Sequence, residues 1–166
     1  MKYKSNILQT PIGKISVYAS EEGVREIRFH NHKKEVLTSL HQEALAQLEE
    51  YFRGRRQVFE LPLSIKGTDF QVRVWDCLRG LGFGETTNYG SIAHSVGSPR
   101  ASRAVGNAVG RNPLPIVIPC HRVLHAGGGI GGFSGGLSKK RWLLNHETFR
   151  SPISRPGAIS LVSVGI

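Results

Sequence analysis

Apolar and polar residues alternate through residues 10–20, and the alternation resumes at residues 24–29. A period of two is typical of a β-strand with one buried face, and Glu22-Gly23 between the two runs favours a turn. The first part of the chain therefore predicts a β-hairpin.

A helical period replaces this alternation further along the chain. From Val36 to Phe52 apolar residues recur every three or four positions, and Gly54 follows as a stop signal. We expect one amphipathic helix that packs its apolar stripe on the sheet, followed by a last strand or a linker at residues 59–65.

In the second half, the helical period returns at residues 70–81, and two short helices are expected at residues 89–96 and 100–110. Ser98 is expected to cap the second of these, with Pro99 at its first helical position. A helix, a glycine turn and a second helix predict a helix-turn-helix.

The last part of the chain combines a short apolar run, a glycine-rich loop and a final helix. Ile116-Val117-Ile118 predicts a short buried strand that ends at Pro119, because proline has no amide hydrogen. The loop at residues 127–136 resembles a phosphate-binding loop in its glycines, but Leu137 stands where that motif needs lysine. Ser138 is expected to cap a final helix at residues 139–147.

The chain has 166 residues, 39% of them apolar, which suffices for one domain or two small ones. No run approaches the roughly 18 apolar residues of a membrane span, and the N-terminus lacks the apolar core of a signal peptide. Cys77 and Cys120 give neither a disulfide framework nor a cysteine-rich metal pattern. We expect a cytoplasmic protein, or one in the nucleus or nucleoid, with a free thiol and no membrane partner.

The net charge of +10 lies mostly in the second half of the chain. Residues 1–65 carry ten Lys/Arg and eight Asp/Glu, whereas residues 66–166 carry twelve and four. This asymmetry favours a polyanionic partner, nucleic acid before membrane, although the charge could also serve solubility alone. Lys139, Lys140 and Arg141 begin the final helix, where cations oppose the helix dipole and a phosphate partner would offset that cost.

The second helix of the helix-turn-helix consists largely of small residues, among them Ser102, Ala104 and Gly106. Such side chains are too short to read base edges, and they favour a close approach of the backbone. Arg103 is long enough to bind phosphate, read a guanine or insert between bases. An ordinary packed helix pair is the alternative.

Cys120 stands between Pro119 and His121, at the end of the apolar run. Basic neighbours favour the thiolate, which is the reactive form of cysteine, and Glu147 could orient His121 in a relay. A buried, unreactive Cys120 is an equally good interpretation, because a cysteine next to a histidine is by itself a weak signal of a reactive thiol. For Cys77, beside a helical apolar face, we expect the role of a small buried hydrophobe.

Six segments in the second half carry a resemblance to one known family: Gly67-Thr68-Asp69-Phe70-Gln71, Arg103-Ala104-Val105-Gly106, Asn112-Pro113, Pro119-Cys120-His121-Arg122-Val123, Ser134-Gly135-Gly136-Leu137, and Trp142-Leu143-Leu144 with Glu147. In this order they resemble the O6-alkylguanine-DNA alkyltransferases, also called methylated-DNA-protein-cysteine methyltransferases. The likeness is close over residues 67–147 and loose around residues 10–13.

The resemblance implies an α/β N-terminal domain, with a ribonuclease-H-like sheet and a helix, over residues 1–65. It implies a mainly α, winged-helix-like domain with a helix-turn-helix over residues 66–147. Residues 148–166 lie outside the likeness, and their proline, glycine and serine content predicts a disordered tail. The implied partner is double-stranded DNA, which a monomer binds through the minor groove.

The implied reaction is irreversible transfer of the alkyl group of O6-alkylguanine, and of O4-alkylthymine, to Cys120 after base flipping. His121, oriented by Glu147, would take the thiol proton, and Tyr89 would donate a proton to the leaving guanine. The thioether product cannot be hydrolysed, so one molecule would repair one lesion.

The same resemblance implies a set of residues that contact DNA or the flipped base. Arg103 would fill the space that the base leaves in the stack, and Asn112 would join the second helix to the cysteine loop. Phe133 occupies a position where many relatives have a tyrosine against the base. The remaining expected contacts are Ser102, Pro115, Arg122 and Ser134. No cofactor and no metal site are expected.

Three other classes share parts of this pattern. A non-enzymatic sensor of alkylation damage would lack Cys120, and a transcription factor would need longer base-reading side chains on its second helix. A thiol hydrolase would use a cysteine and a histidine but would not require the basic second half.

Overall fold

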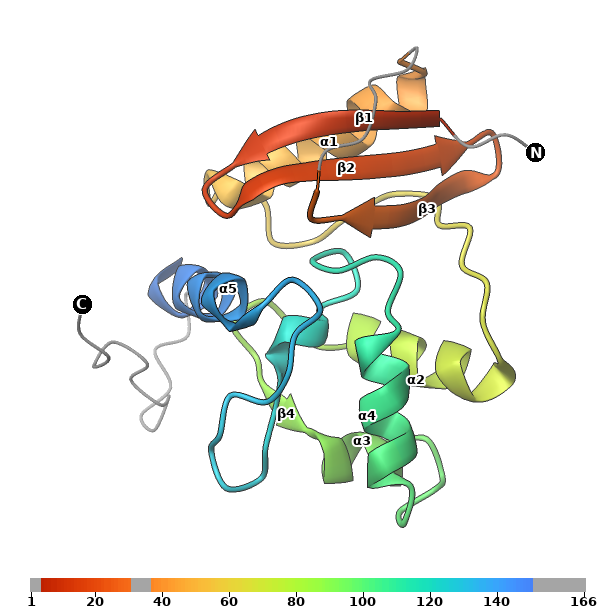
Figure 1. Ribbon diagram of the computed structural model, residues 1–166, viewed down its shortest axis with the longest axis vertical. Coiled ribbons are helices and arrows are strands. Elements are labelled where there is room, and N and C mark those ends of the chain that lie inside the picture. The colour runs from red at the N-terminus through yellow and green to blue at the C-terminus, as the bar shows by residue number, and fades with distance from the viewer. Residues whose placement is uncertain (1–3, 31–36, 151–166) are drawn as a thin grey trace. The chain divides into compact units, whose positions relative to one another are not determined.

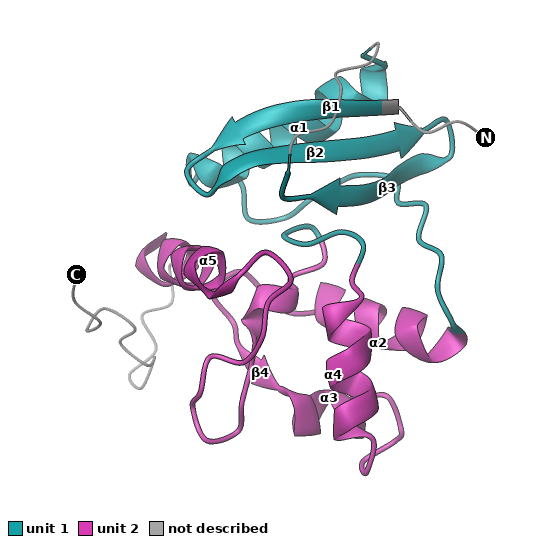
Figure 2. Cartoon of the chain, viewed as in Figure 1, with its two compact units in different colours: residues 1–68, 113–117 teal, residues 69–112, 118–166 magenta. Residues whose placement is uncertain are grey.

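The computed structural model describes residues 4–30 and 37–150. The chain forms two compact units, one of residues 1–68 and 113–117, the other of residues 69–112 and 118–166 (Figure 2). The predicted domains differ from these units at Pro113–Val117, which clusters with the first unit. Part of the predicted tail, residues 148–150, instead continues the last helix, and the rest of it lies outside the described residues.

The first unit contains an antiparallel sheet in the order β1-β2-β3 (Figure 1). Its strands are β1 (Lys4–Thr10), β2 (Gly13–Ser20) and β3 (Gly23–Arg28). Strands β2 and β3 confirm the predicted hairpin. The sequence did not predict β1, because Ser5 and Asn6 are polar yet buried and so break the apolar period.

Helix α1 (Ser39–Phe52) packs on this sheet through Ala44, Leu48 and Tyr51, which are fully buried. A capping box of Thr38 and His41 begins the helix. The helix ends just before Gly54, whose φ of 72° is the left-handed value that terminates helices. The amphipathic helix is thus confirmed, although its predicted first residue, Val36, lies outside the described residues.

Two irregular segments complete the first unit. Residues 59–65 form a linker that meets the sheet at one parallel bridge, between Val24 and Leu63. The segment Pro113–Val117 is attached to β3 because the Ile27 amide donates to the Pro113 carbonyl at 2.9 Å.

The strand predicted at residues 116–118 is wrong. The backbone turns there, and Ile116 adopts a φ of 78°, which β-branched residues rarely do. Ile116 and Ile118 are nevertheless buried. The apolar run therefore reported burial correctly, but burial alone does not distinguish a strand from a packed turn.

The second unit is mainly helical, with α2 (Asp69–Arg79), α3 (Tyr89–Ser95), α4 (Ser102–Gly110) and α5 (Leu137–Arg150) (Figure 1). A short parallel ladder pairs β4 (Thr87–Asn88) with β5 (Val123–Leu124). The Trp75 indole of α2 donates to the Ala108 carbonyl of α4 at 2.8 Å and so joins these helices. Within the described residues, no helix is long and apolar enough to cross a membrane.

Helices α3 and α4 confirm the helix-turn-helix, but α4 begins later than the sequence indicated. The Ser98 carbonyl accepts from the Ala101 amide at 2.9 Å and closes a turn around Pro99, which favours the second position of such turns. Ser98 is therefore not the cap of α4, which begins at Ser102 without a side-chain cap. The predicted cap at Ser138 is also wrong, because α5 begins one residue earlier, at Leu137.

Candidate active site

Cys120 begins a single 3₁₀ turn, Cys120–Arg122, directly after Pro119. Its amide donates to the Ile118 carbonyl at 2.8 Å, and Asn112 Nδ2 donates to the same oxygen at 2.7 Å. Because Asn112 follows the end of α4, this shared carbonyl links the helix-turn-helix to the cysteine loop. Asn112 thus lies where the sequence analysis expected it.

The Cys120 side chain is nearly buried, with 4% of its residue surface exposed. Burial raises the pKa of the thiol, while the Asn112 side chain, the Lys140 ammonium and nearby backbone amides act in the opposite direction. The thiol is therefore protonated at rest, and any reaction of the thiolate must first remove that proton.

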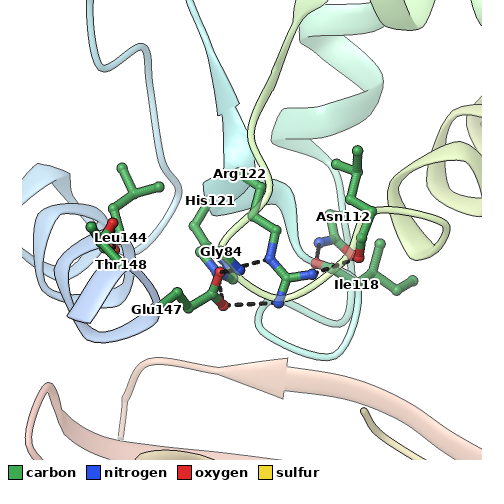
Figure 3. A network of polar contacts seen from close by, with 9 residues as sticks. Gly84, Asn112, Ile118, His121, Arg122, Leu144, Glu147 and Thr148 are labelled. Carbon is green, nitrogen blue, oxygen red and sulfur yellow. Dashed lines mark hydrogen bonds and ion pairs between the residues drawn. The ribbon is translucent and has the colours of Figure 1, made fainter. Parts of the chain in front are cut away.

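A buried cluster of His121, Arg122 and Glu147 follows the thiol in the chain (Figure 3). His121 Nε2 lies 2.7 Å from Glu147 Oε1, and Arg122 Nε donates to Glu147 Oε2 at 2.8 Å. Burial alone would raise the pKa of Glu147, but His121 and Arg122 outweigh it and hold that pKa below its usual range. Glu147 is therefore a carboxylate.

When the His121 ring is neutral, this carboxylate determines which ring nitrogen carries the proton. Glu147 can only accept, so Nε2 donates to it and Nδ1 keeps a lone pair. Nδ1 is buried and has no hydrogen-bond partner. The predicted Glu147–His121 pair is thus present, with Nδ1 as the basic atom.

Arg122 belongs to the buried cluster, and the prediction that it contacts DNA is wrong. The side chain is 5% exposed, and besides its bonds to Glu147 it donates through Nη1 to the Leu81 carbonyl at 2.7 Å. The Gly84 amide also donates to Glu147, at 3.2 Å. Arg122 and Glu147 together therefore hold the turn that follows α2 against the cysteine loop.

An open pocket of about 130 Å³ lies at Cys120. Its wall comes from α3, α4, the cysteine turn and the glycine-rich loop, and the lining residues are Tyr89, Gly106, Val109, Gly110, Cys120, Gly132 and Phe133. Three glycines leave much of this wall without side chains, so that a flat group can approach the backbone closely. The pocket brings together three predicted site residues, Cys120, Tyr89 and Phe133.

Tyr89 lines this pocket with a partly buried hydroxyl group. Burial raises the pKa of its hydroxyl, a hydrogen bond from the Gly132 backbone lowers it, and nearby Cys120 raises it further. The net effect is a raised pKa, so Tyr89 keeps its proton at neutral pH and can donate it.

Among the residues expected to contact DNA or the flipped base, neither Pro115 nor Ser134 lines the pocket. Pro115 is buried within the segment Pro113–Val117 of the first unit. Ser134 is exposed in a turn closed by the bond from the Gly136 amide to the Phe133 carbonyl, at 3.0 Å. Gly132 and Phe133 are the loop residues that reach the pocket instead.

Ser102 and Arg103 are exposed at the start of α4, whereas Val105 and Val109 bury the opposite side of that helix. Both predicted residues are therefore accessible to a partner on the outer face of the helix-turn-helix.

Lys140 is the site residue that the sequence analysis misassigned. It is fully buried, and its Nζ donates to the carbonyls of Val123 at 2.7 Å and Gly132 at 3.0 Å. Burial lowers the pKa of Lys140 to about 8, whereas Cys120 acts to raise it. Lys140 thus ties the glycine-rich loop to β5 and places a cation near the thiol, so it does not face phosphate.

A sequence signal for this burial did exist. Lys140 belongs to the row Lys140, Leu143, Leu144 and Glu147, whose spacing of three and four is that of the buried face of α5.

Together, the helix-turn-helix and the pocket define a class of protein: a DNA-binding unit that carries a nucleophilic cysteine served by a histidine–carboxylate pair. The chain matches the family described as 6-O-methylguanine DNA methyltransferase, with its DNA binding domain over residues 69–149 and its ribonuclease-like domain over residues 3–65. It belongs to this family.

Individual relatives agree with this assignment. The methylated-DNA–protein-cysteine methyltransferase of Methanosarcina acetivorans is 42% identical over 149 residues, which cover 85% of this chain and 96% of that protein. The crystal structure of the Mycobacterium tuberculosis O6-methylguanine methyltransferase matches with a TM-score of 0.83 and 36% identity, covering 91% of this chain and 96% of that one. A structure of the M. tuberculosis protein in complex with DNA matches with a TM-score of 0.79 and 38% identity, covering 90% and 94%.

Proposed function

We propose that this chain repairs alkylated DNA by transferring the alkyl group of O6-alkylguanine to its own Cys120. The observation that carries the proposal is one pocket lined by both Cys120 and Tyr89, together with the pairing of His121, the residue after Cys120, with Glu147. A nucleophile, a base and an acid are the three groups that this transfer requires.

The reaction begins with removal of the thiol proton. Because burial raises the pKa of Cys120, the thiolate forms only when a base takes that proton, and His121 Nδ1 is the available basic atom. The resulting imidazolium is stabilised by the carboxylate of Glu147. Lys140 adds a second cation that favours the thiolate.

The thiolate sulfur then attacks the alkyl carbon, an S–C bond forms, and the bond between that carbon and guanine O6 breaks. The electron pair of the broken bond goes to guanine, which leaves as an anion or accepts a proton from Tyr89. The raised pKa of Tyr89 keeps this proton available. The product on the protein is a thioether that water does not cleave, so each molecule acts once.

A base inside a duplex cannot reach a pocket, so the damaged nucleotide must leave the stack. The outer face of α4 suits this step, because its small residues permit close approach to the minor groove and Arg103 is exposed beside them. We infer that Arg103 fills the space left by the flipped base and that Ser102 contacts the DNA backbone. The protein acts as a monomer, and O4-alkylthymine is a second substrate.

Mass spectrometry after incubation with duplex DNA that contains one O6-methylguanine tests this function. The expected result is one added methyl per protein molecule, located on Cys120 and not on Cys77. The Cys120→Ala variant, and wild type incubated with undamaged DNA, should gain no methyl. Transfer of more than one equivalent, or of none, would contradict the proposal. The same assay with O4-methylthymine DNA tests the second substrate.

A further inference from the structure

We propose that His125 is a positioning residue for Tyr89: its imidazole ring holds the phenol in the orientation from which the hydroxyl serves the pocket. This inference rests on the proposed function, because it concerns the donor of a proton to the leaving guanine. Neither the helical pattern nor the family motifs singled out His125.

The parallel ladder between β4 and β5 brings the two residues together. Thr87 pairs with Val123, and Asn88 pairs with Leu124. Tyr89 begins α3 directly after β4, and His125 directly follows β5, so the ladder brings the two residues close together.

The two rings are in contact. Their centroids are 5.5 Å apart and their planes are inclined by 45°, a tilted arrangement within the favourable range for aromatic pairs. Gly106 of α4 also lies near the phenol, because a Cβ added there would be 3.9 Å from Tyr89 Cδ1 and Cε1. The phenol therefore lies close to the backbone of α4 and in contact with the His125 ring.

The glycine-rich loop passes the end of the same phenol. A Cβ added to Gly131 would lie 2.8 Å from the Tyr89 hydroxyl oxygen, and Gly132 donates a backbone hydrogen bond to that group. A rotation of the phenol would therefore break the contact between the hydroxyl and the loop. The exposed His125 ring opposes such a rotation because it lies against the phenol.

His125 is itself fixed by a tight turn. Its amide donates to the Gly129 carbonyl at 2.8 Å, and its carbonyl accepts from the Gly128 amide at 2.9 Å. Gly128 has a φ of 89°, which favours glycine, and a Cβ added to Gly129 would lie 3.2 Å from His125 Cδ2. Although exposed, the ring is thus held by its own backbone and by close packing on Gly129.

The test measures methyl transfer in single turnover at saturating DNA, so that the chemical step is separated from binding. His125→Ala should slow this step by about three- to tenfold, the range that one aromatic ring pair supports, and should leave affinity for undamaged DNA unchanged. His125→Phe keeps a ring and should restore most of the rate, whereas His125→Gln should not. His94→Ala, which removes another exposed histidine of this unit, is the matched control.

A double-mutant cycle decides whether His125 acts through the Tyr89 hydroxyl. In a Tyr89→Phe background, His125→Ala should cause no further loss of rate, because the group that it positions is gone. A normal rate in His125→Ala, an equally slow His125→Phe, or a full additional loss in the Tyr89→Phe background would each overturn the inference.

A measurement without DNA keeps this inference distinct from the proposed function. In NMR spectra of protein with isotope-labelled tyrosine, the Tyr89 ring signals, assigned with Tyr89→Phe, should move in His125→Ala and much less in His125→Phe. Unmoved signals in His125→Ala would overturn the positioning role even if the wild type transfers methyl. Moved signals in a wild type that transfers none would support the ring contact and reject the proposed function.

Discussion

Polar side chains near Cys120 occur in two different environments within the second unit, a buried cluster and an open pocket. In the buried cluster, His121, Arg122 and Glu147 are almost completely buried and are joined to one another by short hydrogen bonds. At the pocket, Tyr89 and Phe133 are only partly buried, and the wall between them is largely glycine.

We expect substitutions in the buried cluster to lower the stability of the protein, and substitutions in the pocket to change the rate of the reaction. Within the buried cluster, Arg122 and Glu147 are each the partner that the other's charge requires, so removing either one leaves an uncompensated charge. At the pocket wall no buried charge depends on a side chain, so substitutions there should change the reaction more than the fold. The predictions below test this contrast, from the largest expected effect to the smallest.

Glu147→Ala should both destabilise the protein and stop methyl transfer. It leaves Arg122 buried without its carboxylate, which typically costs about 3–5 kcal/mol, and it removes the group that orients His121. Urea unfolding measures the first effect. Asp76→Ala is the control, because its ion pair with Arg79 lies at the surface and should contribute only about 0–1 kcal/mol.

The same cluster predicts the response of the protein to acid. The pKa of Glu147 is lower in the folded protein than its unfolded value of about 4.3, so its stabilising contribution is complete above that value and is lost as pH falls through the folded pKa. A Glu147→Gln protein should lose this part of the pH dependence of stability. An unchanged acid profile would mean that the carboxylate is not held by its neighbours.

Arg103→Ala should slow repair of duplex DNA by about 10- to 100-fold, the rate equivalent of unstacking a base. Repair of a lesion in a single strand should lose far less, because no stack has to be refilled. Arg103 is exposed and belongs neither to the buried cluster nor to the pocket, so the stability of the protein should not change. Equal losses on both substrates would indicate a phosphate contact instead.

Lys140 combines features of both regions, because it is buried like the cluster but lies at the glycine-rich loop. Its pKa of about 8 predicts that the repair rate of the wild type falls above pH 8, where the cation beside the thiolate loses its charge. Tyr89 does not account for this limb, because its pKa is raised. Lys140→Met should be slower by about tenfold at pH 7 and should lack the limb.

Stability should show the opposite dependence on pH. An unfolded lysine has a pKa of about 10.4, so between pH 8 and that value the unfolded chain binds more protons and stability rises with pH. In Lys140→Met this rise should be absent. A wild type whose rate and stability both fall above pH 8 would contradict the assignment to Lys140.

Lys140 and Arg103 also show how far the sequence alone can predict this protein. Both are cations on helices of the second unit, yet Lys140 is fully buried and Arg103 is exposed. Composition cannot separate them, because burial depends on what packs against each helix. Only the spacing of Lys140 with Leu143 and Leu144 indicates its place on the buried face.

Predictions held where one local pattern decides the structure and failed where tertiary contacts do. The hairpin, α1 and the helix-turn-helix follow from periodicity. The pairing of His121 with Glu147, 26 residues apart, is a tertiary contact that the family resemblance implied and that no local pattern indicated. The apolar run around Ile116 predicted burial but not the backbone turn. The charge of Arg122 suggested a contact with DNA, and it did not reveal the buried ion pair with Glu147.

Phe133→Tyr should have the smallest effect, a change in single-turnover rate of less than about threefold. A ring that covers a flipped base acts through its face, which contributes about 1–3 kcal/mol per base, and phenylalanine and tyrosine share that face. Phe133→Ala should therefore cost much more than Phe133→Tyr while leaving the unfolding transition nearly unchanged, since Phe133 lies at the open pocket. A large gain of rate in Phe133→Tyr would mean that the pocket lacks a proton donor that Tyr89 does not replace. A marked loss of stability in Phe133→Ala would instead contradict the difference between the buried cluster and the pocket, because the pocket wall would then stabilise the fold as the buried cluster does.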